Sequence, residues 1–376
     1  MHGMAKLISE RFVNLTDPRQ EPGKKHPLLN LIFIALTASI CGANTWADVE
    51  RFAKAKRAWF DKYLDSSAGI PSHDTFGRVF ARLDTAEFLT ALQNWVKSFA
   101  GELRGEHVAL DGKTLRGSFD RAAEQSALHL LTAYATRSRL CLQQLKVDGK
   151  SNEIPAAVEL LNLMELAGAV VTLDAMHCQV ETAQTIVNRE ADYVLTVKGN
   201  QSNLQDALYQ AFTEHEEGVK PLKELRKIVT NEKSHGRKER REYLVAPVPN
   251  EEVFMRWPGI RAIGMVFREW EAGEKHGDEV TFFISSLPPN VKRLGKLLRD
   301  HWKIESNHYV LDVTFAEDAS RIHKGNGPEI AGAFRRMALN ILQLDTSVKD
   351  NIHGKRVRAG WDESLLDRMY AAISRL

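Results

Sequence analysis

The sequence predicts an α/β protein with a mixed β-sheet core, a helical segment before it and a block of strands inserted into it. Three observations support this prediction. Residues 1–100 show apolar residues at helical spacing, and from residue 106 short β-branched runs alternate with helical patterns. Between residues 221 and 287, four strand-like runs follow one another before a helical pattern returns.

The N-terminal segment is expected to be all-helical. Apolar positions predict helices over residues 27–41, 45–63 and 85–99. Ser72 is a good N-cap for a further helix that contains Phe76–Leu83, because its hydroxyl can accept a hydrogen bond from the first turn. The segment 101–105 begins and ends with glycine and predicts a linker.

The sheet is expected to start near residue 106. Predicted strands cover residues 108–111, 128–135, 140–147, 169–174 and 191–198. Helices are predicted after the third and fourth strands, over residues 155–166 and 180–189. Antiparallel strands therefore come first and parallel crossovers follow, which is the order of an RNase H-like core.

The remainder of the chain is expected to complete this core around an insertion. Further strands are predicted over residues 225–230, 242–246, 260–270 and 280–287, and further helices over 202–217, 294–312 and 327–344. Four regions follow: a helical N-terminal domain (1–100), a core (106–220 and 288–345), a β insertion (221–287) and a C-terminal tail (346–376).

Composition sets bounds on the class of protein. The formal net charge is only +2, so a surface for a polyanion must come from local clustering of charge. Three widely spaced cysteines indicate a reducing compartment such as the cytoplasm and no disulfide framework. The apolar run Leu29–Cys41 is too short to span a bilayer, which needs about 20 residues, so no membrane association is expected.

Three acidic residues are the candidate catalytic group. Asp111 and Asp174 each end a buried, β-branched strand pattern, and Glu305 lies on a later helix. Alone, Asp111 before Gly112 indicates a turn more often than a ligand. The helix face of Glu305 is unlike a solvated one, because it also carries Leu298, His301, Trp302 and His308. Together the three carboxylates predict a site for two Mg²⁺ (or Mn²⁺) ions about 3.5–4 Å apart, which cleaves a phosphodiester.

Five blocks of sequence carry a resemblance to a known family. They are Pro71-Ser-His-Asp-Thr-Phe76, Asp111-Gly-Lys-Thr-Leu-Arg116, Thr172-Leu-Asp-Ala-Met-His-Cys-Gln179, Asp192-Tyr-Val-Leu-Thr-Val-Lys-Gly-Asn-Gln201, and His301-Trp-Lys-Ile-Glu305 followed by Leu311-Asp-Val-Thr-Phe-Ala-Glu-Asp318. In this order they resemble the DDE transposases of bacterial insertion sequences, and most of all the subgroup of H-repeat-associated proteins. The resemblance covers nearly the whole chain.

The resemblance implies a DNA transposase whose catalytic and metal-binding triad is Asp111, Asp174 and Glu305. Such an enzyme binds terminal inverted repeats, cleaves at the 3′ ends and joins them to target DNA. It works on double-stranded DNA as a homodimer or larger assembly. One departure concerns the tyrosine, arginine and lysine that accompany the glutamate in related transposases, because these positions hold Leu298, His301 and Asp312. Arg299, Lys303 or His308 are candidates to replace the missing charges.

Other residues are candidate DNA contacts. Lys198 ends a predicted strand near Asp174, and the Gly199-Asn200-Gln201 that follows could let DNA approach; a solvated lysine is an equally good interpretation. His177 and Gln179 follow Asp174, where they could contact DNA, support the site or simply begin a helix. His301, Lys303 and His308 flank Glu305. Asp312, Glu317 and Asp318 are expected to be structural or hydrogen-bonding, with a role as metal ligands as the alternative.

Two basic segments are further candidates for contact with DNA. The run 233–241 holds five Lys and Arg residues against one acid, and Arg237, Lys238, Arg240 and Arg241 could bind phosphates; a solvated hairpin is the alternative. The helix after Ser72 is similar to a recognition helix, with Arg78 toward the major groove. It could instead be a packing helix, which would make the N-terminal domain a dimerisation element.

Two other functions remain open on the sequence. The chain could be a domesticated DNA-binding or regulatory protein derived from a transposase, although its triad is intact. It could also be a metal-dependent nuclease or phosphatase of the same fold. The helical N-terminal segment and the basic hairpin favour the transposase over this last alternative.

Overall fold

A nine-stranded mixed β-sheet runs through the computed structural model, which describes residues 10–374 except 121–123, 125, 148–152 and 235. The strand order is β3-β2-β1-β4-β5-β9-β8-β7-β6. The strands are β1 (His107–Thr114), β2 (His129–Ala135), β3 (Leu140–Val147), β4 (Val170–Leu173), β5 (Asp192–Val197), β6 (Arg226–Ser234), β7 (Arg237–Pro247), β8 (Ala262–Ala272) and β9 (Lys275–Ser285). The predicted mixed α/β architecture is therefore confirmed.

The strands β1, β4 and β5 run parallel to one another, and β4 between them is buried. All four residues of β4 (Val-Val-Thr-Leu) are buried, as expected for a strand with helices on both faces of the sheet. β1 pairs with β4 in parallel, and β4 with β5 in parallel, whereas β2 and β3 pair antiparallel on the other side of β1. In the β1–β4 register Leu110 lies opposite Leu173. The residues that follow, Asp111 and Asp174, therefore emerge together at the same edge of the sheet.

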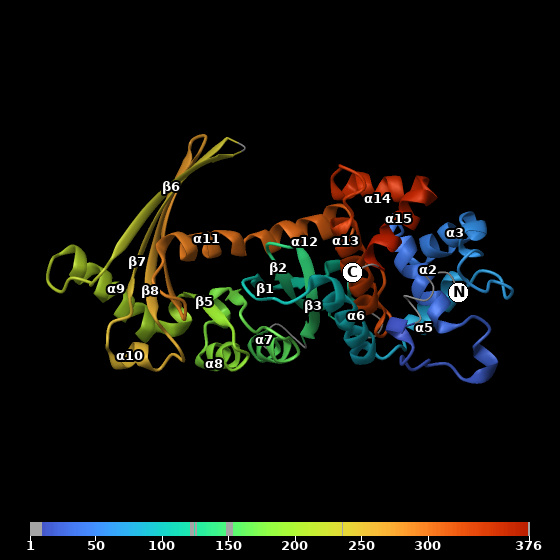
Figure 1. Ribbon diagram of the computed structural model, residues 1–376, viewed down its shortest axis with the longest axis horizontal. Helices are drawn as coiled ribbons and strands as arrows, with labels where there is room; N and C mark the ends of the chain where they lie inside the picture. The colour runs from blue at the N-terminus through green and yellow to red at the C-terminus, as the bar shows by residue number, and fades with distance from the viewer. Residues whose placement is uncertain (1–9, 121–123, 125, 148–152, 235, 375–376) are drawn as a thin grey trace.

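The four later strands form an antiparallel meander that extends the same sheet. β9 pairs with β5, and β8, β7 and β6 follow in turn. β7, β8 and β9 have 11 residues each, and their outer parts project from the body of the molecule as an arm (Figure 1). The insertion is thus continuous with the core sheet through the β5–β9 pairing.

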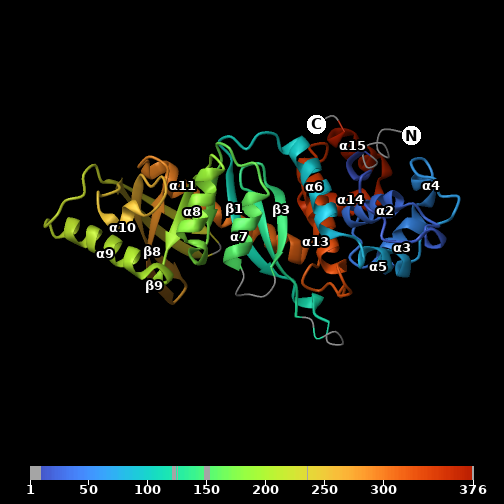
Figure 2. The ribbon, with the colours of Figure 1, turned by 90° about the horizontal axis from the view of Figure 1, so that it is seen from below.

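Helices cover both faces of the sheet. One face carries α7 (Glu153–Asn162), α8 (Val180–Asn188), α9 (Ser202–Glu216) and α10 (Glu252–Met255) (Figures 1 and 2). The opposite face carries α11 (Val291–His301) and α12 (Lys303–Val313). One helix was predicted over 294–312. The structure divides it at Trp302, which is the C-cap of α11 and the N-cap of α12 and keeps helical φ and ψ, so the two helices follow one another closely.

A helical lobe at one end of the sheet combines both ends of the chain. It contains α2 (Leu28–Ile40), α3 (Trp46–Ala55), α4 (Arg57–Phe60), α5 (His73–Phe80), α6 (Thr85–Ala100), α13 (Gly327–Leu344), α14 (Ile352–Trp361) and α15 (Glu363–Ile373). The almost wholly buried α13 lies between α2, α6 and β3. The Phe33 and Tyr370 rings lie 5.5 Å apart, and the Tyr370 hydroxyl is 2.8 Å from Thr37 Oγ1.

Two sequence expectations differ from this lobe. The helix predicted over 45–63 is two helices, because Lys56 leaves helical geometry between α3 and α4. Residues 346–374, for which no element was predicted, contain α14 and α15. Ser72 does act as the predicted N-cap of α5, since its side chain accepts a hydrogen bond from the Thr75 amide. None of the helices described is long and apolar enough to cross a membrane.

Candidate active site

Asp111 and Asp174 lie at neighbouring positions where β4 ends, whereas β1 continues to Thr114, beyond its predicted end at Asp111. Asp111 belongs to β1, and Asp174 directly follows β4. Asp174 caps the short 3₁₀ helix η4 (Ala175–His177), because its Oδ1 accepts a 2.7 Å hydrogen bond from the Ala175 amide. The cap fixes the backbone where the chain leaves the sheet, and the parallel register brings the two aspartates together.

Glu305 reaches the same region from α12. This helix buries Ile304, His308 and Leu311 and leaves Glu305 exposed. His308 Nδ1 lies 3.5 Å from Asp111 Oδ2, which places the first turns of α12 against the middle of β1. Glu305, the third acidic residue, therefore lies in the same region as Asp111 and Asp174.

The charges of these carboxylates act on one another. Burial, together with the charges of Asp174, Glu305 and Glu153, raises the pKa of Asp111 to about 7, against a hydrogen bond from the Gly112 amide that lowers it. Carboxylates that repel one another in this way are suitable oxygen ligands for a hard divalent cation, whose charge offsets theirs. The donor set therefore fits Mg²⁺ or Mn²⁺ in its chemistry. Across the described ranges, no three or more His, Cys, Asp or Glu side chains are already arranged to hold a metal ion.

Asp174 and Glu305 open onto a groove of about 400 Å³ between the core and the arm. Four cationic side chains also line it: Lys198, Arg241, Arg268 and Arg299. The three arginines are ion-paired, and all of their partners are Glu232, Glu239 or Glu279. Lys198 is exposed and forms no ion pair with any described residue. It is the lysine that the sequence placed near Asp174.

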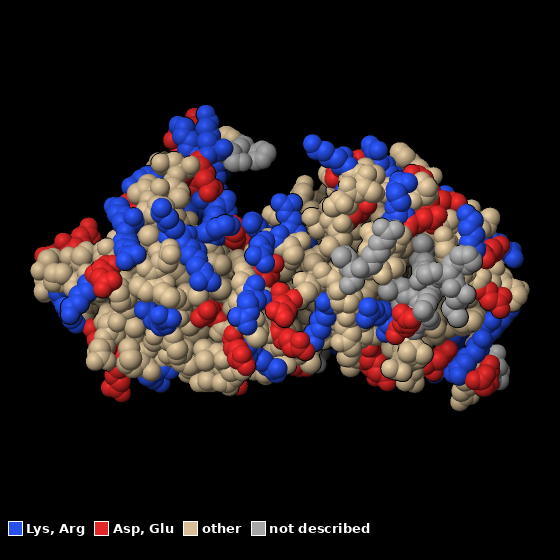
Figure 3. Space-filling model, viewed as in Figure 1, with Lys and Arg blue, Asp and Glu red and all other residues tan. Residues whose placement is uncertain are grey.

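The basic hairpin lies on the arm, in β7. Lys and Arg side chains gather over this arm and over the hollow between it and the helical lobe (Figure 3). Each of the four predicted basic residues has an acidic partner. Lys238 pairs with Glu271, Arg240 with Glu242 and Glu269, Arg241 with Glu232 and Glu239, and Arg237 with Glu239 while it stacks on Trp270. The surface is thus a ladder of opposite charges rather than a run of free cations.

Three predicted histidines are largely buried. His177, His301 and His308 are 2%, 9% and 9% exposed. His301 lines the groove and lies 2.8 Å from Thr172 Oγ1, and burial lowers its pKa to about 4, although the charge of Asp174 raises it. Burial likewise lowers the pKa of His308 to about 3. These imidazoles are neutral at pH 7, and contact with DNA would require them to become more exposed.

The remaining candidates are accounted for by local contacts. Asn200 donates to the Ala175 carbonyl at 2.9 Å, and Gln201 donates to Gln179 Oε1 at 3.0 Å, so they tie the turn after β5 to η4 and to the N-cap of α8. Lys303 pairs with Asp300 at 3.0 Å. Arg78 is exposed on α5 and makes no ion pair within the part of the chain that is described.

Two charged residues near the site were missed from the sequence. Lys113 is buried and contacts Asp312, Glu317 and Asp318. Its position two residues after Asp111, on the same face of the strand, was an available signal. Glu153 begins α7 and acts on Asp111 through its charge, but it precedes the predicted helix and no pattern marked it.

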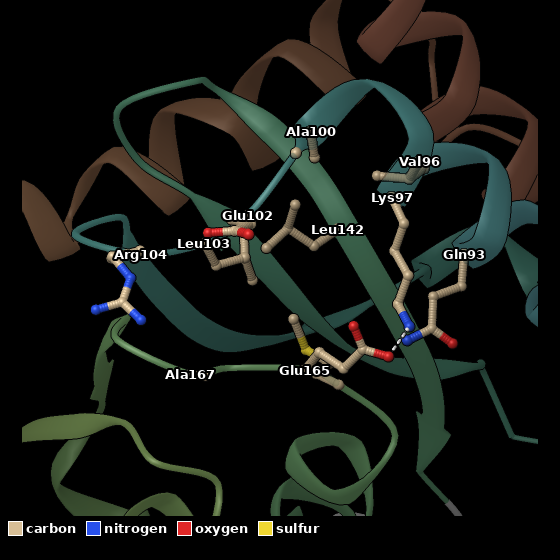
Figure 4. Close-up of a pocket in the computed structure, with 12 residues that line it drawn as sticks. Gln93, Val96, Lys97, Ala100, Glu102, Leu103, Arg104, Leu142, Glu165 and Ala167 are labelled. Carbon is tan, nitrogen blue, oxygen red and sulfur yellow. Dashed lines mark hydrogen bonds and ion pairs between the residues drawn. The ribbon is translucent and has the colours of Figure 1, made fainter. Parts of the chain in front are cut away.

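A second cavity, of about 280 Å³, lies at the junction of α6, the 101–105 linker and the segment after α7 (Figure 4). Apolar side chains such as Val96, Leu103 and Leu142 line it, and Lys97 pairs with Glu165 across its rim at 2.8 Å. It shares no lining residue with the groove.

The chain matches a known protein family and named relatives over most of its length. A family model described as "Transposase DDE domain" matches residues 102–341, and one described as "DDE_Tnp_1-associated" matches residues 9–96. The "Putative transposase YncI" of Escherichia coli O157:H7 is 36% identical over 96% of this chain and 94% of its own length. The "H repeat-associated putative transposase YhhI" of E. coli K12 is 34% identical over 97% of this chain and 98% of its own. The solved piggyBac transposase synaptic complex with hairpin DNA aligns with a TM-score of 0.43 and 10% identity, over 98% of this chain and 78% of the other.

Proposed function

Because the chain belongs to the Transposase DDE domain family, as its sequence motifs predicted, we propose that it is a DNA transposase with the catalytic triad Asp111, Asp174 and Glu305. One observation supports this assignment most directly. The register that pairs Leu110 with Leu173 brings the two aspartates to one sheet edge, where α12 supplies the glutamate.

We further propose that the core is RNase H-like. The order β3-β2-β1-β4-β5, with β2 and β3 antiparallel and β4 and β5 parallel to β1, agrees with that interpretation. Such a core holds its metal ligands at three places: on the first strand, after the fourth strand, and on a helix across the sheet. Here an acidic residue occupies each of these places.

Asp111 and Asp174 would bracket two Mg²⁺ or Mn²⁺ ions, and Glu305 would complete the second site. When bound, the ions activate water and stabilise the charge that develops on the phosphate. The chain itself supplies the anionic ligands and a groove beside them. Lys198 is the groove cation best placed to bind phosphate, since it has no ion-pair partner in the described structure.

The reaction would proceed in two displacements on double-stranded DNA. Water attacks a phosphorus at the element end, and the bond to the 3′ oxygen breaks, which leaves a 3′-OH. That hydroxyl then attacks a phosphorus of target DNA and displaces another 3′ oxygen. The basic hairpin would hold DNA along the arm, and α5 with Arg78 would read the terminal inverted repeat. Two or more copies would pair the ends.

The test is cleavage of linear DNA that carries the sequences flanking this gene. Asp111→Ala, Asp174→Ala and Glu305→Ala should each abolish cleavage, whereas each variant should remain folded and bind DNA about as the wild type does. Asp206→Ala, an exposed acid on α9, is the matched control. Mg²⁺ and Mn²⁺ should support cleavage, and Ca²⁺ only binding. Cleavage at the wild-type rate by Glu305→Ala, or in EDTA, would rule out the proposal.

A further inference from the structure

We propose that Glu153 is a positioning residue of this active site: it clamps His129 of β2 and His177 of η4, and so braces strand β1 against the turn that begins with Asp174. The inference rests on the proposed function, because it concerns the same triad.

Glu153 contacts both imidazoles. Its Oε1 lies 2.5 Å from His129 Nε2, and its Oε2 lies 3.6 Å from His177 Nε2. The three side chains are 13%, 11% and 2% exposed, so water competes little for these contacts. They come from α7, β2 and η4, three elements that are far apart in the sequence. One carboxylate therefore adds a side-chain link between β2 and the turn after β4, next to the backbone pairing of β1 with both β2 and β4.

On the side of β1, His129 and Glu153 lie close to Gly112, the residue after Asp111. A Cβ atom at Gly112 would lie 2.6 Å from His129 Nε2 and 3.2 Å from Glu153 Oε2, so only glycine leaves room for the pair. His129 Nδ1 also lies 2.8 Å from Thr114 Oγ1, two residues farther along β1. The imidazole is thus held between Glu153 and the strand that carries Asp111.

On the other side, the clamp reaches the turn that Asp174 begins. Asp174 is the N-cap of η4 and His177 is its last residue, and the His177 amide donates to the Asp174 carbonyl at 2.9 Å. His177 Nδ1 is buried and has no hydrogen-bond partner among the described residues. The approach of Glu153 Oε2 to within 3.6 Å of His177 Nε2 is therefore the polar contact through which Glu153 would orient this ring and the short turn after Asp174.

The charge of Glu153 fits this role better than an amide would. Both oxygens of a carboxylate are acceptors, so each can face one imidazole nitrogen, whereas a glutamine has a single acceptor oxygen. The same charge reaches Asp111, whose pKa it helps to raise. Groups that orient metal ligands in this way commonly change metal affinity about 10–100-fold when they are removed.

The experiment measures Mn²⁺ binding by calorimetry, without DNA, in the full-length protein. Glu153→Ala should weaken Mn²⁺ binding about tenfold or more, and Glu153→Gln should weaken it less, because one contact remains. Glu159→Gln, an exposed acid on the same helix, should bind as the wild type does. Thermal unfolding of each variant shows whether it is folded, and Glu153→Gln keeps the test decisive if Glu153→Ala does not fold.

A double-mutant cycle tests whether Glu153 acts through His177. The Glu153→Ala/His177→Ala protein should bind Mn²⁺ about as weakly as either single variant, since both remove the same brace. Multiplied losses would overturn the positioning role, as would wild-type affinity in a folded Glu153→Ala protein. A wild-type protein that binds no Mn²⁺ would instead reject the proposed function. Single-turnover cleavage should fall in parallel with Mn²⁺ affinity at fixed metal concentration, and DNA affinity should stay within about twofold.

Discussion

Lys113 and Asp312 join strand β1 to helix α12 and thereby set the register between Asp111 and Glu305. Lys113 lies two residues beyond Asp111, and Asp312 lies two turns beyond Glu305 on the same side of α12. The lysine also contacts Glu317 and Asp318 at 3.1 Å each. Asp312 lies on α12 and opposes sliding of the helix along the strand, and Glu317 and Asp318 hold the lysine from the segment that follows. This ionic hub therefore fixes the position of Glu305 relative to Asp111.

Glu317 is the least exposed member of this hub and should dominate its contribution to stability. Its side chain is 0% exposed and lies 2.7 Å from Arg336 and 3.1 Å from Lys113. Glu317→Gln should cost about 3–5 kcal/mol in the free energy of unfolding, because it leaves the buried Arg336 without its acidic partner and removes one of the three acids around Lys113. Urea denaturation at pH 7 measures this change.

The same carboxylate predicts a pH dependence. Although burial opposes ionisation, the charges of Arg336 and Lys113 lower the pKa of Glu317 to about 2 from its ordinary 4.5. A lowered folded pKa gives stability that is present above pH 4.5 and is lost as the pH falls toward 2. The Glu317→Gln protein should lose less stability over this range. Glu165→Gln, which removes an exposed pair with Lys97, should change neither the free energy of unfolding at pH 7 nor its loss at low pH appreciably. Equal acid curves for wild type and Glu317→Gln would contradict the assignment.

Asp111 should have the opposite effect on the metal-free protein. Its folded pKa of about 7 lies above its ordinary 3.8, so its contribution to stability is present below pH 3.8 and is lost as the pH rises through 7. In EDTA at pH 8, Asp111→Asn should therefore be more stable than the wild type, on the order of 1–2 kcal/mol after its partial exposure is considered. At pH 5 the difference should shrink. Added Mn²⁺ should stabilise the wild type but not the variant. A destabilised Asp111→Asn protein at pH 8 would argue against the raised pKa that burial and the neighbouring carboxylates give Asp111.

Lys198 should make a measurable contact with phosphate. It is the groove cation without an acidic partner in the described structure, so Lys198→Ala should weaken DNA binding and lower the slope of log affinity against log salt by about 1. Fluorescence anisotropy over a salt series gives the slope. Lys303→Ala is a suitable comparison, because Lys303 is already paired with Asp300. An unchanged slope for Lys198→Ala would mean that Lys198 is only a solvated residue at the end of its strand.

Neutralising the basic hairpin should lower the salt slope of DNA binding by less than its number of cations indicates. Four free cations would lower the salt slope by about 4 when removed. Here each of Arg237, Lys238, Arg240 and Arg241 is shared with an acid of the arm, so a variant that neutralises all four should lower the slope by only about 1–2. A drop near 4 would mean that DNA displaces the acidic partners, and no drop would exclude the hairpin from the interface.

The sequence predicted local features better than contacts between distant segments. The β-branched runs before Asp111 and Asp174 identified buried strands, and parallel pairing brought their ends together without further information. Nothing local indicates that Lys113 meets Asp312, or that Glu153 lies between two histidines, because side chains distant in sequence make these contacts. α14 and α15 are exceptions, because they are local helices for which no element was predicted.

The helical lobe bears on how end recognition by Arg78 must be tested. α5 buries Phe76, Val79 and Phe80 and exposes Arg78, as a recognition helix packed on one face would. An isolated N-terminal fragment would be a poor test, since α2 packs on α13 and Phe33 contacts Tyr370. The full chain should therefore be used.

Arg78→Ala in the full chain should weaken binding to the terminal repeat by about 1–3 kcal/mol and relax preference at one base pair, if the guanidinium makes a bidentate contact with guanine. Selection of bound sequences from a random pool, with wild type and variant in parallel, measures both effects. Arg82→Ala, just beyond the end of α5 and also exposed, shows whether the effect belongs to the helix or to general positive charge. Equal losses on random DNA and on the repeat would make Arg78 a phosphate contact. An unchanged selection would leave α5 as a packing helix and favour dimerisation as the role of this segment.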